Sequence, residues 1–200
     1  MTTKIEWVQN QDGSPGETLN LWTGCLNHDG KGNCLGGGFP CYAYRLANTR
    51  LKDIYLANKN VAPLIDDLPS TYSKSLYDPF YPRWWEERYR KYLPRVAGKR
   101  HKPRGIFLND MSDWAGEGIP EAWQEKMFTL INLYPEDRFY LLTKCPENLL
   151  KWSPFPSNVY LGVTVCNQEM FNKAVYYLKM VEAKVKFLSI EPLLERLNAK

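Results

Sequence analysis

The stretch VYLGVTV at residues 159–165 decides the fold, because it is a short and almost wholly apolar run of strand-forming residues. A helical pattern follows it, with one apolar stripe made of Phe171, Ala174, Val175, Leu178 and Val181. Val185–Ile190 is then a second apolar strand, ending at Glu191-Pro192. A strand, a helix and a second buried strand predict two parallel neighbours joined by a right-handed crossover.

The same alternation extends towards the N-terminus. We expect strands at Thr18–Thr23, Ile106–Asn109 and Arg138–Thr143, and helices at Tyr42–Asn58 and Pro120–Leu133. About five such units predict an α/β fold of parallel strands, as a partial or complete (β/α) barrel or an open doubly wound sheet. No Gly-x-Gly-x-x-Gly follows the first strand, which disfavours a dinucleotide-binding fold.

The composition is that of an ordinary globular protein. The chain has 200 residues, of which 44% are hydrophobic and 24% charged, with a net charge of +4. We therefore expect a single domain over residues 1–200 and no disorder, and the charge alone does not indicate nucleic acid. The first residues lack the apolar core of a signal peptide, and no apolar run is long enough to span a membrane. We expect a cytoplasmic protein.

Three cysteines lie close together in the loop of residues 25–41, at Cys25, Cys34 and Cys41. The residues between them are rich in glycine and asparagine, which favour tight turns and contribute little to a core. Clustered thiols in a cytoplasmic chain bind metal more often than they form disulfides. The loop therefore predicts an iron–sulfur cluster or a zinc ion, and His28 within it leaves a Cys3His zinc site as an alternative.

Polar side chains follow the expected strands. Because the carboxyl ends of parallel strands share one rim, where ligands bind, these side chains and the cysteine loop after the first strand should meet there. The candidate binding residues are Asn109, Ser112, Asp113, Thr143, Lys144, Thr164, Asn167, Ser189 and Glu191. For any one of them the alternative is capping of the next helix, and Asp113 and Asn167 could each do only that.

Residues 59–103 form the expected insertion, a helical segment rich in basic and aromatic side chains. Within residues 83–104, arginines and lysines are interleaved with Trp84, Trp85, Tyr89 and Tyr92. This combination suits nucleic acid, through phosphate contacts and stacking. The alternative, which we favour, is an amphipathic helix that buries Trp85, Tyr89 and Tyr92.

Eight short motifs follow one another along the chain: Thr3–Trp7, Trp22–Cys25, Cys41–Ala43, Lys102–Phe107, Met111–Asp113, Leu142–Lys144, Leu161–Val165 and Leu188–Leu193. Together they resemble successive motifs of the phage-associated three-cysteine-motif proteins, a family of unknown function. That family in turn resembles radical S-adenosylmethionine (SAM) enzymes.

The resemblance implies a radical SAM-like (β/α) barrel and a 4Fe–4S cluster bound by Cys25, Cys34 and Cys41. It implies that SAM binds at the open iron and is cleaved by one electron, and that the nine candidate binding residues hold SAM and an unidentified substrate. It also implies a protein partner, since family members are often encoded beside a second gene.

The chain departs from the radical SAM pattern in three ways. Six residues separate Cys34 from Cys41, where two are usual. The strands end at Val185–Ile190, which leaves an open barrel edge that a second chain could cover. Cys145 and Cys166 follow two strands, where each could be a fourth ligand or simply a small buried residue. The rival function is a zinc- or cluster-stabilised module that binds nucleic acid or a protein without SAM chemistry.

Overall fold

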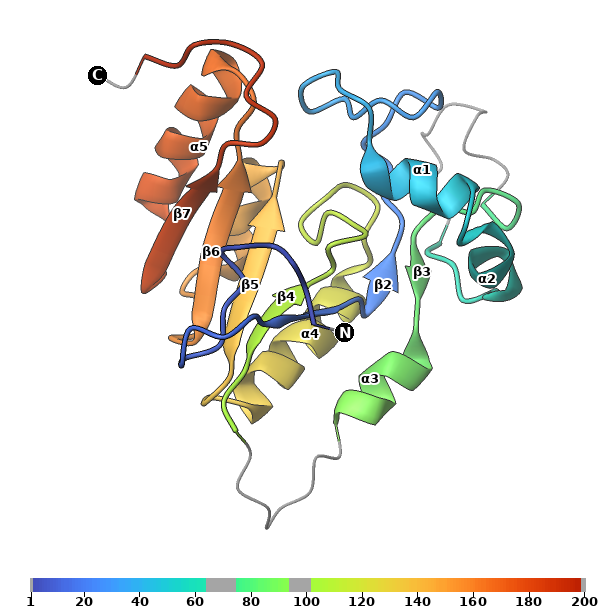
Figure 1. Ribbon diagram of the computed structural model, residues 1–200, viewed down its shortest axis with the longest axis horizontal. Helices are drawn as coiled ribbons and strands as arrows, with labels where there is room; N and C mark the ends of the chain where they lie inside the picture. Colours follow the sequence, from blue (N-terminus) through green and yellow to red (C-terminus); the bar gives the residue numbers. More distant parts are fainter. Residues whose placement is uncertain (1, 64–74, 94–101, 199–200) are drawn as a thin grey trace.

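The computed structural model describes residues 2–63, 75–93 and 102–198, and its centre is one parallel sheet (Figure 1). Its five strands lie in chain order: β1 (Glu17–Leu19), β4 (Gly105–Leu108), β5 (Arg138–Thr143), β6 (Val159–Thr164) and β7 (Val185–Ser189). The last four are connected by α4 (Glu121–Leu133), the 3-10 helix η2 (Pro146–Trp152) and α5 (Gln168–Met180). The α/β prediction is confirmed, and the strands of the described residues form an open sheet without closing a barrel.

Most boundaries match the expected elements, and two expected elements are divided. β5 spans the predicted Arg138–Thr143, and α4 begins directly after its N-cap Pro120. The single strand predicted at Thr18–Thr23 is instead β1 and a separate strand β2 (Trp22–Thr23). The single helix predicted at Tyr42–Asn58 is instead α1 (Tyr42–Asn48) and α2 (Lys52–Ala57), since the Leu51 N–H bonds to the carbonyl of Leu46 and closes the first helix.

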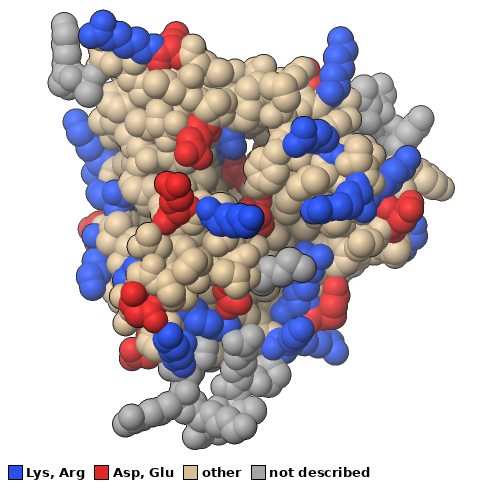
Figure 2. Space-filling view, viewed as in Figure 1, with Lys and Arg blue, Asp and Glu red and all other residues tan. Residues whose placement is uncertain are grey.

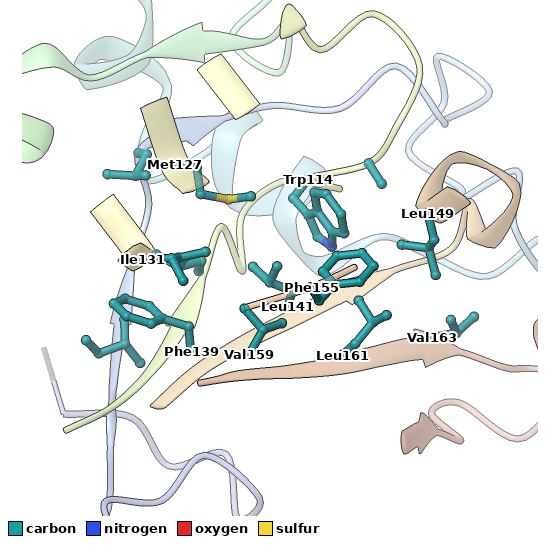
Figure 3. Close-up of a cluster of buried hydrophobic side chains, with 14 of the residues drawn as sticks. Trp114, Met127, Ile131, Phe139, Leu141, Leu149, Phe155, Val159, Leu161 and Val163 are labelled. Carbon is teal, nitrogen blue, oxygen red and sulfur yellow. The ribbon is translucent and has the colours of Figure 1, made fainter. Parts of the chain in front are cut away.

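The outer face of the sheet packs against the helices and forms the main core. Alternate strand residues point to this face, among them Phe139 and Leu141 of β5 and Leu161 of β6, all fully buried. Figure 3 shows Met127 and Ile131 of α4 facing these strands. None of the helices in the described part of the chain is long and apolar enough to cross a bilayer.

The inner face is covered differently, by the segment that precedes β1. Trp7 lies on it with its ring centroid 5.0 Å from that of Phe107, 5.7 Å from Tyr140 and 5.3 Å from Phe187. A Cβ at Gly162 would lie 2.4 Å from Cζ of Phe187, so only glycine leaves room for that ring. Figure 1 shows this N-terminal segment crossing the sheet on the side opposite α4 and α5.

A smaller layer lies beside the sheet and contains the aromatic insertion. β2 pairs antiparallel with β3 (Arg83–Trp84), which leads into α3 (Glu86–Tyr92). Trp85 and Tyr92 are buried and Tyr89 is partly buried, so the amphipathic packing that we favoured for this segment is confirmed.

Three arginines within residues 83–104 make contacts inside the fold. Arg83 is fully buried and donates to backbone carbonyls, including that of Asn58 at 2.7 Å. Arg88 lies over the ring of Trp85 at 4.1 Å, and Arg104 pairs with Glu17 and Asp137. Nucleic-acid binding through residues 83–104 stays a prediction, and its residues Arg95, Lys99 and Arg100 lie outside the described residues.

Candidate functional site

A cavity of about 1080 Å³ lies on the inner face, at the carboxyl ends of the strands. Its walls come from the sheet, from residues 3–7, from the cysteine loop and from α1. Figure 2 shows the surface hollowed between the sheet and the layer that carries α1, with acidic and basic side chains around the opening. Its volume is slightly above the usual range for small-molecule sites, about 300–1,000 Å³.

Six of the nine candidate binding residues line this cavity: Ser112, Asp113, Lys144, Thr164, Ser189 and Glu191. The other three make internal hydrogen bonds. The Asn109 side chain accepts from the Leu21 N–H at 2.8 Å, and the Thr143 hydroxyl donates to Asp113 at 2.6 Å. Asn167 caps α5 by accepting from the Met170 N–H at 2.9 Å, which is the capping role we named as its alternative.

Asp113 connects two adjacent strand ends. One carboxylate oxygen accepts from the Thr143 hydroxyl, and the other accepts from the Lys144 N–H at 2.8 Å. Asp113 therefore does more than cap a helix, because it fixes the backbone from which the Lys144 side chain enters the cavity.

The cysteine loop lies over the ends of β5 and β6. A Cβ at Gly36 would lie 3.2 Å from Cδ of Lys144, and a Cβ at Gly37 would lie 3.2 Å from Cβ of Cys166. Cys34 and Cys41 line the cavity. Cys25, at the start of the loop, does not line it.

The three thiols share one electrostatic environment with Asp113 and Lys144. Burial, followed by the charge of Asp113, raises the pKa of Cys25 to about 12. Burial also raises the pKa of Cys34, against the opposing effect of Lys144. Burial lowers the pKa of Lys144, but Asp113 and the three thiols outweigh it and raise that pKa above its ordinary value. Lys144 is therefore a persistent positive charge among these thiols.

Thiols are suitable ligands for a metal centre, but these three are too far apart in this structure to bind one ion together. The Asn27 N–H donates to Cys25 Sγ at 3.3 Å, and the Tyr44 N–H donates to Cys41 Sγ at 3.5 Å. Hydrogen bonds to sulfur help to set the properties of metal-bound thiolates. Within the described residues, however, no three His, Cys, Asp or Glu side chains are close enough to hold a metal ion.

The remaining candidate ligands make contacts of their own. The His28 ring is buried beside Tyr44 and Phe80, and its Nδ1 accepts from the Gly30 N–H at 3.1 Å. Cys166 is fully buried and Cys145 partly buried, and burial raises the pKa of both thiols. The small-buried-residue alternative fits Cys166.

Sequence reasoning missed the part of the cavity wall that precedes β1. Thr3, Lys4, Ile5 and Trp7 line the cavity, as does Arg50 after α1. Thr3–Trp7 entered the sequence analysis only as a motif of the resemblance, and the alternation of Ile5 and Trp7 with polar residues is a further signal that this segment covers an apolar surface.

The chain belongs to a family described as a protein of unknown function (DUF5131), whose model matches residues 2–200. No curated protein matches the chain, and no solved structure does.

Proposed function

We propose that this chain is an iron–sulfur protein of the radical SAM type. Cys25, Cys34 and Cys41 would bind a 4Fe–4S cluster at the edge of the cavity, and the cavity would hold SAM and an unidentified substrate. The observation that carries the proposal is the position of the cysteine loop. It lies over the carboxyl ends of parallel strands, with two of its thiols in the wall of a ligand-sized cavity.

Metal binding would require the loop to close further around the ion. The glycines of the loop suit such a closure, since Gly30, Gly32, Gly37 and Gly38 all have positive φ angles. Burial raises the pKa of the Cys25 and Cys34 thiols, so metal binding there would release protons and would be stronger at higher pH. Closure coupled to metal binding is usual for small thiolate sites.

The chain's own residues would then provide charge, shape and shielding. Lys144 would offset the negative charge of the thiolates. Trp7, Phe107 and Leu142 form apolar parts of the wall that would keep water from the reacting atoms. A bound cluster would supply the electron that cleaves SAM.

Anaerobic reconstitution with iron and sulfide tests the proposal. The wild-type protein should take up about four iron atoms per chain, and SAM should alter the EPR spectrum of the reduced protein. Three single variants, Cys25→Ser, Cys34→Ser and Cys41→Ser, should each lose most of the iron uptake. Cys145→Ser and Cys166→Ser are matched controls, because both thiols lie at the same rim, and both variants should retain the iron.

Three other results would each support a different conclusion. Iron loss in Cys145→Ser or Cys166→Ser would identify a fourth thiolate ligand and exclude an open iron for SAM. An EPR spectrum indifferent to SAM would reduce the proposal to an iron–sulfur protein. Stoichiometric zinc in protein purified without oxygen would favour the metal-stabilised binding module.

A further inference from the structure

Three donor side chains lie next to one another where β5, β6 and β7 end in the cavity. They are Lys144, Thr164 and Ser189, one from each strand end, and all three line the cavity. Thr164 is the register partner of Ser189, and Thr143, just before Lys144, is the register partner of Val163. The parallel register therefore brings the three side chains to the same level of the sheet.

Thr164 supplies the observation that points to a ligand. The residue is only 3% exposed, and among the described residues its hydroxyl has no hydrogen-bond partner. A buried hydroxyl without a partner is costly, so such groups in folded proteins are normally paired with protein, water or ligand. Rotation about the Cα–Cβ bond exchanges the hydroxyl with the methyl group, which lets the oxygen turn towards a polar atom in the cavity.

Lys144 and Ser189 are also available to a ligand. No ion pair or side-chain hydrogen bond of Lys144 is found in the described part of the chain, and its ammonium lies 5.9 Å from the centroid of the Phe39 ring. Ser189 is 9% exposed and lines the cavity. Three carboxylates of the described residues line the same cavity. Asp113 already accepts from Thr143 and from the Lys144 backbone, Asp110 accepts from the Asn20 side chain, and Glu191 is exposed.

We propose that Lys144, Thr164 and Ser189 form a subsite for an oxyanion, a carboxylate or phosphate group of the small molecule that occupies the cavity. The ammonium and both hydroxyls can each donate a hydrogen bond to such a group, and the ammonium also carries the opposite charge, which makes its hydrogen bond a strong one. The proposal deepens the function of the same cavity. It rests on the cavity being a ligand site but needs neither the cluster nor SAM.

The test uses the full-length, metal-free protein and two probes, inorganic phosphate and acetate. Each is titrated against sodium chloride at matched ionic strength, and binding is followed by calorimetry and by the unfolding midpoint. One probe should bind saturably to the wild-type protein. Thr164→Val and Lys144→Met should each weaken its binding about tenfold or more, the loss expected for one hydrogen bond to a charged group.

Two variants serve as matched controls. Thr129→Val removes a hydroxyl that donates to the Glu125 carbonyl on the exposed side of α4, and Lys151→Met removes a surface ammonium paired with Glu121. Both should bind the probe as the wild-type protein does. Without any probe, Thr164→Val should unfold at the same or a higher midpoint, because valine has the shape of threonine and leaves no unpaired hydroxyl.

Saturable phosphate binding would identify a phosphate-bearing ligand, and saturable acetate binding a carboxylate. The proposal is overturned if neither probe binds saturably, if Thr164→Val and Lys144→Met bind as the controls do, or if Thr164→Val lowers the midpoint of the probe-free protein. A protein with serine at Cys25, Cys34 and Cys41 should bind no iron and still bind the probe, so this proposal and the iron–sulfur function can fail separately.

Discussion

The two faces of the parallel sheet are covered by different parts of the chain and to different extents. The outer face is covered by helices that are adjacent to their strands in the sequence, and its side chains are buried almost without exception. The inner face is covered only in part, by a segment around Trp7, and the remainder is open as the cavity. In a closed barrel the opposite strands would bury that face.

The difference separates residues that hold the fold from residues that shape the site. Leu141 and Leu142 are consecutive in β5, yet Leu141 is fully buried under the helices while Leu142 lines the cavity. Alternation along one strand therefore places one leucine in the packed core and the next in the cavity wall. Three substitutions test this division.

The largest effect is expected on the outer face. Leu141→Ala should lower the free energy of unfolding by about 3 kcal/mol, because it leaves a void in a packed core. Leu142→Ala should lower it by less than about 1 kcal/mol, because that side chain already borders open space. Urea unfolding of both variants measures the difference, and equal losses would show that the inner face is packed as tightly as the outer one.

An intermediate effect is expected where the inner face is covered. Trp7→Ala should lower the free energy of unfolding by about 2 kcal/mol, less than for a fully buried tryptophan because Trp7 is partly exposed. It removes the ring contacts with Phe107, Tyr140 and Phe187. Glu6→Ala is the control, since Glu6 is exposed and should change stability little. An unchanged free energy of unfolding in Trp7→Ala would mean that the ring contacts of Trp7 do not stabilise the fold.

The smallest effect concerns the cysteine loop above the cavity. Burial lowers the pKa of His28, with Asp78 and Asp29 opposing the shift. The unfolded chain then binds a proton more readily than the folded one. Burial of the neutral His28 ring therefore makes its full contribution to stability above the unfolded pKa, about 6.5. That contribution is lost as the pH falls through the lower pKa of the folded state.

The corresponding variant is His28→Asn in metal-free protein, since an asparagine oxygen can accept from the Gly30 N–H as Nδ1 does. Its unfolding free energy, measured in urea at pH values on both sides of the histidine range, should fall less steeply with acid than that of the wild type. Identical slopes would show that His28 is protonated equally in both states.

The sequence predicts what depends on neighbouring residues. β5 is recovered with its boundaries because Arg138–Thr143 is one continuous run of strand formers between polar segments. The rim residues are recovered in part because parallel strands place their carboxyl ends together, whatever the details of packing.

The rest depends on contacts between distant residues. The strand expected at Thr18–Thr23 is divided because Asn109, 88 positions from Leu21, accepts its N–H and holds the turn into β2. Nothing local in residues 18–23 specifies that bond. The contribution of Trp7 to the cavity wall was missed for the same reason, since its ring partners belong to three strands far along the chain.

The anchoring of the first residues has a practical consequence for handling the protein. The Thr3 N–H bonds to the carbonyl of Gly16 at 2.9 Å, and Thr3 and Lys4 border the cavity. An affinity tag fused ahead of Thr2 would therefore be tethered next to the cavity. A polyhistidine tag placed there would add imidazoles beside Cys34 and Cys41, so it should be cleaved before any titration or elemental assay.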